Sequence, residues 1–226
     1  MGGEGCVTVW LIDLAVAPCV VRRCAAWLDA AERRRAERRS GVPGAYRRFV
    51  VAHGALRDIL AQALDWEPAA LAFAYERGGK PRLRGATLHF NLSHSRDLAL
   101  LAVGCAGPLG VDVEYQHRGL EPEALARQVF SRAERRELAA VPVGQREEAF
   151  FNGWTRKEAL IKAWGGSLFR DARRFSVSLT PGRPARIAPP LDALWRIHDF
   201  EPRPGYKAAL ATPVGVRHWS LRRWTP

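Results

Sequence analysis

Hydrophobic and polar residues recur along this chain with two periods, and the period of a segment predicts its secondary structure. Apolar residues at helical spacing, such as Phe49, Leu56 and Leu60, predict a helix over residues 45–63. Segments that alternate between apolar and polar residues predict strands. The predicted helices are 20–39, 45–63, 121–130, 132–140 and 147–164, and the predicted strands are 7–14, 71–75, 88–92, 98–103, 111–114, 175–179, 194–200, 206–211 and 216–224.

The order of these segments predicts the fold class. Helices followed by strands occur twice, which indicates an α+β protein made of two similar halves. Gly107-Pro108 lies near the middle of the 226 residues and is the predicted seam, so the halves are residues 1–108 and 109–226. The sequence Gly-Gly-Lys-Pro at residues 78–81 predicts a loop.

The composition is typical of a globular protein of the cytoplasm. Hydrophobic residues make up 47% of the chain and charged residues 26%, and charged side chains interrupt every apolar run before it reaches the length of a membrane span. We find no pattern of a secretory signal. Four cysteines lack the spacing of a zinc site and are expected to be reduced thiols. These are Cys6, Cys19, Cys24 and Cys105.

The charge of the chain indicates an anionic partner. The formal net charge is +12, from 35 basic and 23 acidic residues. Nine arginines and three acids lie between Arg22 and Arg48. This local excess predicts a phosphate-binding surface in the first half. A solvated helix face would explain the same residues equally well.

Two carboxylates alternate along the strand predicted at residues 111–114. Asp112 and Glu114 are two positions apart, so they face the same side of the sheet. Two acids on one face repel each other, and a divalent cation would compensate for their charge. Taken alone, the pattern also fits a solvent-facing strand with two exposed acids.

A second acid and a lysine share one face of the helix predicted at residues 147–164. Trp154, Glu158 and Lys162 follow one another at intervals of four. A Glu–Lys pair at this spacing is a common surface pair. The neighbouring residues are large and apolar, however, which predicts that this pair is buried and therefore paired or bound to a ligand.

Two shorter segments carry groups suited to phosphate oxygens. Ser93, His94 and Ser95 end a predicted strand with two hydroxyls and an imidazole. Lys80 follows two glycines, which let the backbone approach a ligand closely. Helix or loop caps and an ordinary exposed turn would explain these residues too.

Five motifs in this order resemble those of the 4′-phosphopantetheinyl transferases. The resemblance is to the Sfp-type branch, whose members are monomers with two fused, similar halves. The motifs are Arg77-Gly-Gly-Lys-Pro81, Phe90-Asn-Leu-Ser-His-Ser95, Gly110-Val-Asp-Val-Glu114, Phe130-Ser-Arg-Ala-Glu134 and Trp154-Thr-Arg-Lys-Glu-Ala-Leu-Ile-Lys162. They cover residues 77–162, and the plan of two halves extends to nearly the whole chain.

The resemblance implies a fold, a reaction and a set of ligands. The two halves would be related by a pseudo-two-fold axis, with the active site at their interface. The enzyme would move the 4′-phosphopantetheine arm of coenzyme A to a serine of an acyl, peptidyl or aryl carrier protein and release adenosine 3′,5′-bisphosphate. Asp112, Glu114 and Glu158 would bind Mg²⁺, with Mn²⁺ as an alternative.

The resemblance also implies roles for the basic residues. Lys80, Ser93, His94 and Lys162 would contact the pyrophosphate of coenzyme A, and Arg48 and Arg35 would contact its 3′-phosphate, with Arg38 competing with Arg35. His94 and Lys162 would stabilise the leaving group, and Glu158 is the candidate base. Glu134 would touch the water shell of the metal or the carrier. Lys157 belongs to the motif without an assigned role.

The partners follow from the same resemblance. We expect a monomer that acts on carrier domains, among which those of nonribosomal peptide and polyketide synthases are the first candidates, and that binds neither nucleic acid nor membrane. Residues 120–132 are the expected docking region for the carrier. Two alternatives remain at this point. One is a basic nucleic-acid-binding protein, which leaves the three acids unexplained, and the other is a non-catalytic interaction module.

Overall fold

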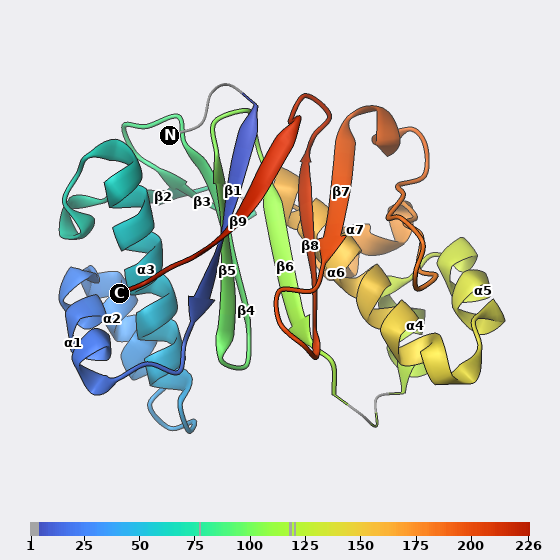
Figure 1. Cartoon of the computed structure of the whole chain (residues 1–226), viewed down its shortest axis with the longest axis horizontal. Coiled ribbons are helices and arrows are strands. Elements are labelled where there is room, and N and C mark those ends of the chain that lie inside the picture. The colour runs from blue at the N-terminus through green and yellow to red at the C-terminus, as the bar shows by residue number, and fades with distance from the viewer. Residues whose placement is uncertain (1–4, 77, 118, 120) are drawn as a thin grey trace.

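The structure is a computed structural model that describes residues 5–76, 78–117, 119 and 121–226. Two β-sheets lie side by side in the middle of the molecule, and helices cover the outer side of each (Figure 1). Three clusters of buried side chains lie between these layers. The protein is therefore of the α+β class, as the sequence predicts.

The first sheet has the strand order β4-β5-β1-β9 and the second β6-β8-β7, and a separate hairpin is formed by β2 and β3. The strands are β1 Cys6–Asp13, β2 Phe73–Tyr75, β3 Pro81–Leu83, β4 His89–Ser95, β5 Leu98–Gly104, β6 Gly110–Tyr115, β7 Trp195–Phe200, β8 Tyr206–Pro213 and β9 His218–Arg223. The α-helices are α1 Pro18–Trp27, α2 Ala30–Glu37, α3 Ala45–Leu64, α4 Pro122–Val129, α5 Arg132–Ala140, α6 Arg146–Trp164 and α7 Leu168–Asp171. Short 3₁₀ turns lie at Pro68–Ala70, Val143–Gln145, Ala172–Arg174 and Leu191–Ala193.

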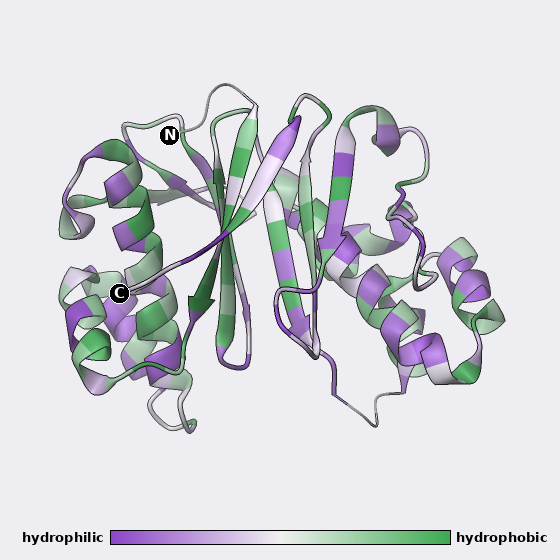
Figure 2. Cartoon of the chain, in the orientation of Figure 1, coloured by the Kyte–Doolittle hydropathy of each residue, from purple (hydrophilic) through white to green (hydrophobic). Residues whose placement is uncertain are grey.

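The alternation of residues along the strands builds the layers. In β1, Val7, Val9 and Leu11 belong to the cluster between the two sheets, whereas Ile12 packs toward the helices. Hydrophobic residues accordingly gather on the central strands, and hydrophilic ones on the outer turns of the helices (Figure 2).

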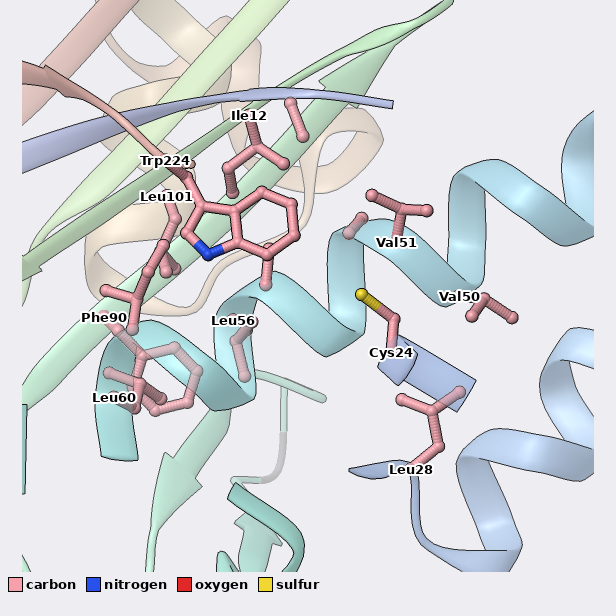
Figure 3. Packing of buried hydrophobic residues seen from close by; sticks show 14 of the residues in the cluster. Ile12, Cys24, Leu28, Val50, Val51, Leu56, Leu60, Phe90, Leu101 and Trp224 are labelled. Atoms are coloured by element: carbon pink, nitrogen blue, oxygen red, sulfur yellow. The ribbon is translucent and has the colours of Figure 1, made fainter. Parts of the chain in front are cut away.

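The cluster under the first sheet joins α1 and α3 to the strands. Figure 3 shows Trp224 and Leu101 above Leu56 of α3, with Cys24 of α1 on the other side of that helix. None of the helices in the described ranges is long and apolar enough to cross a bilayer.

The last strand leaves the half in which the sequence places it. β9 pairs in parallel with β1, from Cys6 opposite His218 to Leu11 opposite Arg223. Residue 109 onward therefore supplies one strand to the first sheet. Strand periodicity identifies a strand but not its partner, so only the three-dimensional structure reveals this exchange. The division at residue 108 stays a prediction.

Two predicted elements differ from the structure. The helix predicted at 20–39 is interrupted after Trp27, because Asp29 forms a capping box with Glu32 and starts a new helix. Residues 175–179 form one isolated bridge, Val177 with Ile187, in place of a strand. The carboxylates of Glu134 and Glu137 accept hydrogen bonds from the backbone N–H groups of Val177 and Leu179, which a strand partner would otherwise accept.

The loop predicted around residue 80 is shorter than expected. Pro81 already belongs to β3, where it lies opposite Tyr75 of β2. The turn of this hairpin is closed by a hydrogen bond from the N–H of Glu76 to the carbonyl of Lys80.

Candidate active site

A polar seam joins the facing edges of the two sheets. The side chains of Asn91, Ser93 and Ser95, which alternate along β4, reach β6. The amide oxygen of Asn91 accepts a hydrogen bond from the N–H of Val111 at 2.8 Å. The hydroxyl of Ser93 donates to Asp112 Oδ1 at 2.8 Å, and that of Ser95 donates to Glu114 Oε2 at 2.8 Å. Side chains therefore bridge two strands that belong to different sheets.

Lys162 of α6 supplies the positive charge that the acids of β6 require. Its Nζ lies 2.6 Å from Asp112 Oδ1 and 3.1 Å from the hydroxyl oxygen of Ser93. The Asp112 side chain is 3% exposed, so this is an almost fully buried pair. Burial acts to lower the pKa of Lys162, but Asp112 and Glu158 outweigh it and raise that pKa. Lys162 is therefore protonated at neutral pH.

The remaining carboxylates of the cluster are held in a state that favours protonation. Burial, followed by the charge of Asp112, raises the pKa of Glu114 to about 7, against the opposing hydrogen bond from Ser95. Burial also raises the pKa of Glu158, with Lys162 opposing and Asp112 adding to the shift. Three acids thus compete for the charge of one lysine.

The three predicted metal ligands do not form a ready-made cage. In the ranges that the structure describes, no three His, Cys, Asp or Glu side chains are arranged to enclose an ion. The donor set nevertheless fits a hard cation. Asp112 Oδ2 is buried without a hydrogen-bond partner, and the crowding described above raises the pKa values of Glu114 and Glu158. A divalent cation would satisfy the first and relieve the second.

His94 lies on the opposite face of β4 from Ser93 and Ser95, because neighbouring residues of a strand alternate in direction. Its side chain is exposed at one edge of a basic surface. The protein around it lowers the pKa of His94, and the charges of His53, Lys162, Arg48 and Arg39 lower it further. The ring is therefore neutral at neutral pH and can donate one hydrogen bond.

The basic surface beside His94 comes from α2, its C-terminal turn and the start of α3. Arg35 and Arg39 stack over the ring of Phe49, at 5.4 and 4.6 Å from its centroid. Arg48 is 27% exposed and donates to the carbonyl of Pro43. Arg39 was missed from the sequence, because a run of similar arginines does not reveal which of them share one face. No contact places Arg38 in this cluster.

A buried ion pair fixes α2, and hence its arginines, against α3. Arg57 is fully buried, and its Nε lies 2.7 Å from Glu32 Oε2, while Asp29 accepts a second bond at 3.1 Å. The other carboxylate oxygen of Glu32 lies 3.1 Å from Nδ1 of His53, which stacks on Phe49. Helix α2 is therefore a fixed support for the basic surface.

Lys80 and Ser93 lie elsewhere than the resemblance implies. Lys80 donates to three backbone carbonyls, and burial lowers its pKa to about 8 while Glu76 opposes this shift. The hydroxyl of Ser93 is engaged by Asp112 and Lys162. Neither group points a free donor toward the basic surface.

Glu134 and Lys157 form a separate buried pair in the second half. Lys157 Nζ lies 2.6 Å from Glu134 Oε1 and 2.8 Å from the carbonyl oxygen of Phe175, and both side chains are at most 1% exposed. Glu134 also accepts from the N–H groups of Val177 and Ser131. The expectation that Glu134 touches a metal or a carrier differs from this arrangement, since all of these contacts are internal. Of the expected docking region, Leu120 lies outside the described residues.

A carboxylate–lysine centre next to a surface of arginines suits the transfer of a phosphorylated group. Comparison with known proteins agrees with this chemistry. The family model described as the 4′-phosphopantetheinyl transferase superfamily matches residues 108–211.

Three curated relatives carry the name of the same enzyme. The 4′-phosphopantetheinyl transferase HetI of Nostoc sp. is 35% identical over 224 residues, which cover 96% of this chain and 91% of HetI. The enzyme psf-1 of Bacillus pumilus is 30% identical over 76% of this chain and 74% of its own length. AcpT of Salmonella typhimurium is 39% identical over 50% of this chain and 58% of its own length. This chain therefore belongs to the 4′-phosphopantetheinyl transferase superfamily and is a transferase.

Proposed function

We propose that this enzyme transfers the 4′-phosphopantetheine arm of coenzyme A to a serine of a carrier protein. The serine hydroxyl forms a new bond to the β-phosphorus of coenzyme A, the bond from that phosphorus to the bridging oxygen breaks, and adenosine 3′,5′-bisphosphate leaves. The observation that carries the proposal is the convergence of Asp112, Glu114, Glu158 and Lys162 beside a basic surface.

The seam between β4 and β6 is the proposed active site. It lies where the first sheet meets the second, which is where an interface between two pseudo-symmetric halves would be. The order of elements supports such symmetry, because each half adds helices to the outer side of its own sheet (Figure 1). The Sfp-type branch is the proposed subgroup.

Asp112, Glu114 and Glu158 are the proposed ligands of Mg²⁺. The orphan Oδ2 of Asp112 and the raised pKa values of the two glutamates support this donor set. When bound, the ion supplies charge neutralisation for the pyrophosphate oxygens. Ser95 orients Glu114 through its 2.8 Å hydrogen bond, and Ser93 does the same for Asp112.

Lys162, His94 and Glu158 are the proposed catalytic groups. Lys162 is protonated and stabilises negative charge that grows on the leaving bisphosphate, and His94 donates a hydrogen bond to it from the other face of β4. Glu158 takes the proton of the carrier serine. Its raised pKa makes it a better base than an exposed glutamate.

Arg48 and Arg35 are the proposed contacts of the 3′-phosphate, and Arg39 joins them. We expect Arg48→Ala to raise KM for coenzyme A about 10-fold or more, because a charge-assisted hydrogen bond is worth about 1.5–3 kcal/mol. KM for dephospho-coenzyme A, which lacks this phosphate, should change little. Steady-state kinetics with both donors measure the difference.

Arg23→Ala is the matched control for this prediction. Arg23 belongs to the same arginine-rich run but stacks over Trp27 of α1, with its guanidinium 5.7 Å from the ring centroid. It should leave both KM values unchanged. An equal rise in the two KM values of Arg48→Ala would remove Arg48 from the 3′-phosphate site.

Carrier domains of nonribosomal peptide and polyketide synthases are the proposed acceptors to test first. The net charge of +12 supports a partner with an acidic surface, because complementary charge speeds and orients encounter. The segment 120–132 stays the proposed docking region. A monomer that works in the cytoplasm is part of the same proposal.

Mass spectrometry of an apo carrier tests the proposal directly. The purified enzyme is incubated with the carrier, coenzyme A and Mg²⁺, and a gain of one phosphopantetheine arm is expected. A carrier whose acceptor serine is replaced by alanine is the control and should gain nothing. No gain on any of several carriers of different origin would contradict the proposed reaction.

A further inference from the structure

The ammonium of Lys80 has all of its donors engaged by the second half of the chain. Its Nζ lies 2.8 Å from the carbonyl oxygen of Leu109, 2.7 Å from that of Lys162 and 2.7 Å from that of Ala163. An ammonium carries three N–H donors, and three acceptors exhaust them. None is left for a phosphate oxygen.

These acceptors include carbonyls that helix α6 cannot satisfy by itself. The last four carbonyls of an α-helix have no partner within the helix. At the end of α6, the N–H groups of Gly165 and Gly166 both bond to the carbonyl of Ile161. Lys80 accounts for the next two carbonyls along the chain. It also places a positive charge at the negative end of the helix dipole, where cations are stabilising.

A second observation places the same loop against the same helix end. Gly78 packs so closely on Gly165 that a Cβ at residue 78 would collide with the carbonyl oxygen of Gly165. The Cβ that an alanine at residue 165 would carry would touch the stem of Lys80 and the carboxylate of Glu76. The turn of the β2–β3 hairpin is therefore docked on the C-terminal end of α6 by backbone contact as well as by Lys80.

The groups that Lys80 holds belong to both sides of the buried ion pair. The last turn of α6 carries Lys162, and Leu109 immediately precedes β6, which carries Asp112. A shift of either element would change the 2.6 Å contact between Lys162 Nζ and Asp112 Oδ1. One side chain from the first half thus restrains both partners in the second.

We propose that Lys80 is a positioning residue that caps α6 across the boundary between the halves and thereby holds Lys162 against Asp112. This inference rests on the proposed function for its kinetic consequence and on the hydrogen bonds alone for its structural consequence. It replaces the contact between Lys80 and coenzyme A that the resemblance implies.

Lys80→Met tests the cap, because methionine keeps the length of the stem and removes the ammonium. We expect kcat to fall about 10- to 100-fold, since small displacements of catalytic groups have effects of this size, while KM for coenzyme A stays within about threefold. The melting temperature should fall by about 4 °C or more. Amides in the last turn of α6 should exchange hydrogen faster.

Arg203→Met is the matched control. Arg203 also pairs across the halves, at 3.1 Å from Asp13, but it does not contact α6. It should leave kcat and the exchange of the α6 amides unchanged. A 10-fold rise in KM for Lys80→Met, with kcat, melting temperature and exchange unchanged, would assign Lys80 to coenzyme A and overturn the proposal.

Lys80→Arg covers the case in which Lys80→Met does not fold. A planar guanidinium cannot reach three converging carbonyls as an ammonium does, so kcat and the melting temperature should still fall, though less. A variant identical to the parent in both would overturn the proposal, because arginine replaces lysine readily only as a phosphate contact. If the parent shows no transferase activity, the proposed function fails, and the melting temperature and amide exchange still decide the cap.

Discussion

Asp112→Ala is expected to lower kcat/KM by about 1,000-fold or more while leaving the fold intact. The substitution removes one proposed ligand of Mg²⁺ and the buried partner of Lys162 at the same time. A loss of this size corresponds to about 4 kcal/mol of transition-state stabilisation, the scale of a placed electrostatic group in an active site. Carrier modification at saturating Mg²⁺ measures the loss, and circular dichroism with thermal unfolding monitors the fold.

The shape of Asp112 can be separated from its charge. Asp112→Asn keeps an acceptor for Ser93 and Lys162 but removes the negative charge, and its activity should also be lost if the charge binds the ion. Asp58→Asn is the matched control, because Asp58 accepts a hydrogen bond from Trp224 Nε1 at 2.8 Å, outside the proposed active site. Activity of either Asp112 variant within threefold of the parent would remove Asp112 from the metal site.

Direct titration with metal adds an independent measure of the same residue. Calorimetry with Mg²⁺ or Mn²⁺ should show binding to the parent and to Asp58→Asn, and much weaker binding to Asp112→Ala. Binding that is equal in all three proteins would contradict the donor set even if the activity of Asp112→Ala were lost.

Local periodicity explains why part of the site could be predicted from the sequence. The spacing of two places Asp112 and Glu114 on one face of β6, and the spacing of four places Glu158 and Lys162 on one face of α6. Both spacings act within a single element. The electrostatic coupling of these four groups follows from the packing of β6 against α6.

The rest of the site depends on contacts between distant segments, which no local period encodes. The partners of Lys80 lie 29, 82 and 83 residues along the chain from it. The hydroxyl of Ser93 could be recognised as a donor, but not that Asp112 would accept from it. The break after Trp27 was different, because Asp29 and Glu32 have the spacing of a capping box and could have been recognised.

The buried pair in the second half carries the largest expected effect on stability. Glu134→Ala would leave the ammonium of Lys157 without its carboxylate inside a core where both side chains are at most 1% exposed. Removing one partner of such a pair costs about 3–5 kcal/mol. Two backbone N–H groups, of Ser131 and Val177, would also lose their acceptor. We expect the melting temperature to fall by roughly 10 °C.

Replacing both partners separates the ion pair from the backbone contacts. The double variant Glu134→Leu, Lys157→Met removes both charges and should recover part of the loss, because no uncompensated charge remains in the core. It should not recover all of it, since Ser131 and Val177 still lack an acceptor. Thermal unfolding of the parent, both single variants and the double variant gives the coupling energy of the pair.

The kinetics of the same variants decide what Glu134 does in the reaction. Measured well below their melting temperatures, the Glu134 and Lys157 variants should keep kcat and KM for coenzyme A within about threefold of the parent, because both side chains make only internal contacts. A Glu134→Ala variant that melts like the parent but has lost kcat would return Glu134 to the water shell of the metal or to the surface for the carrier.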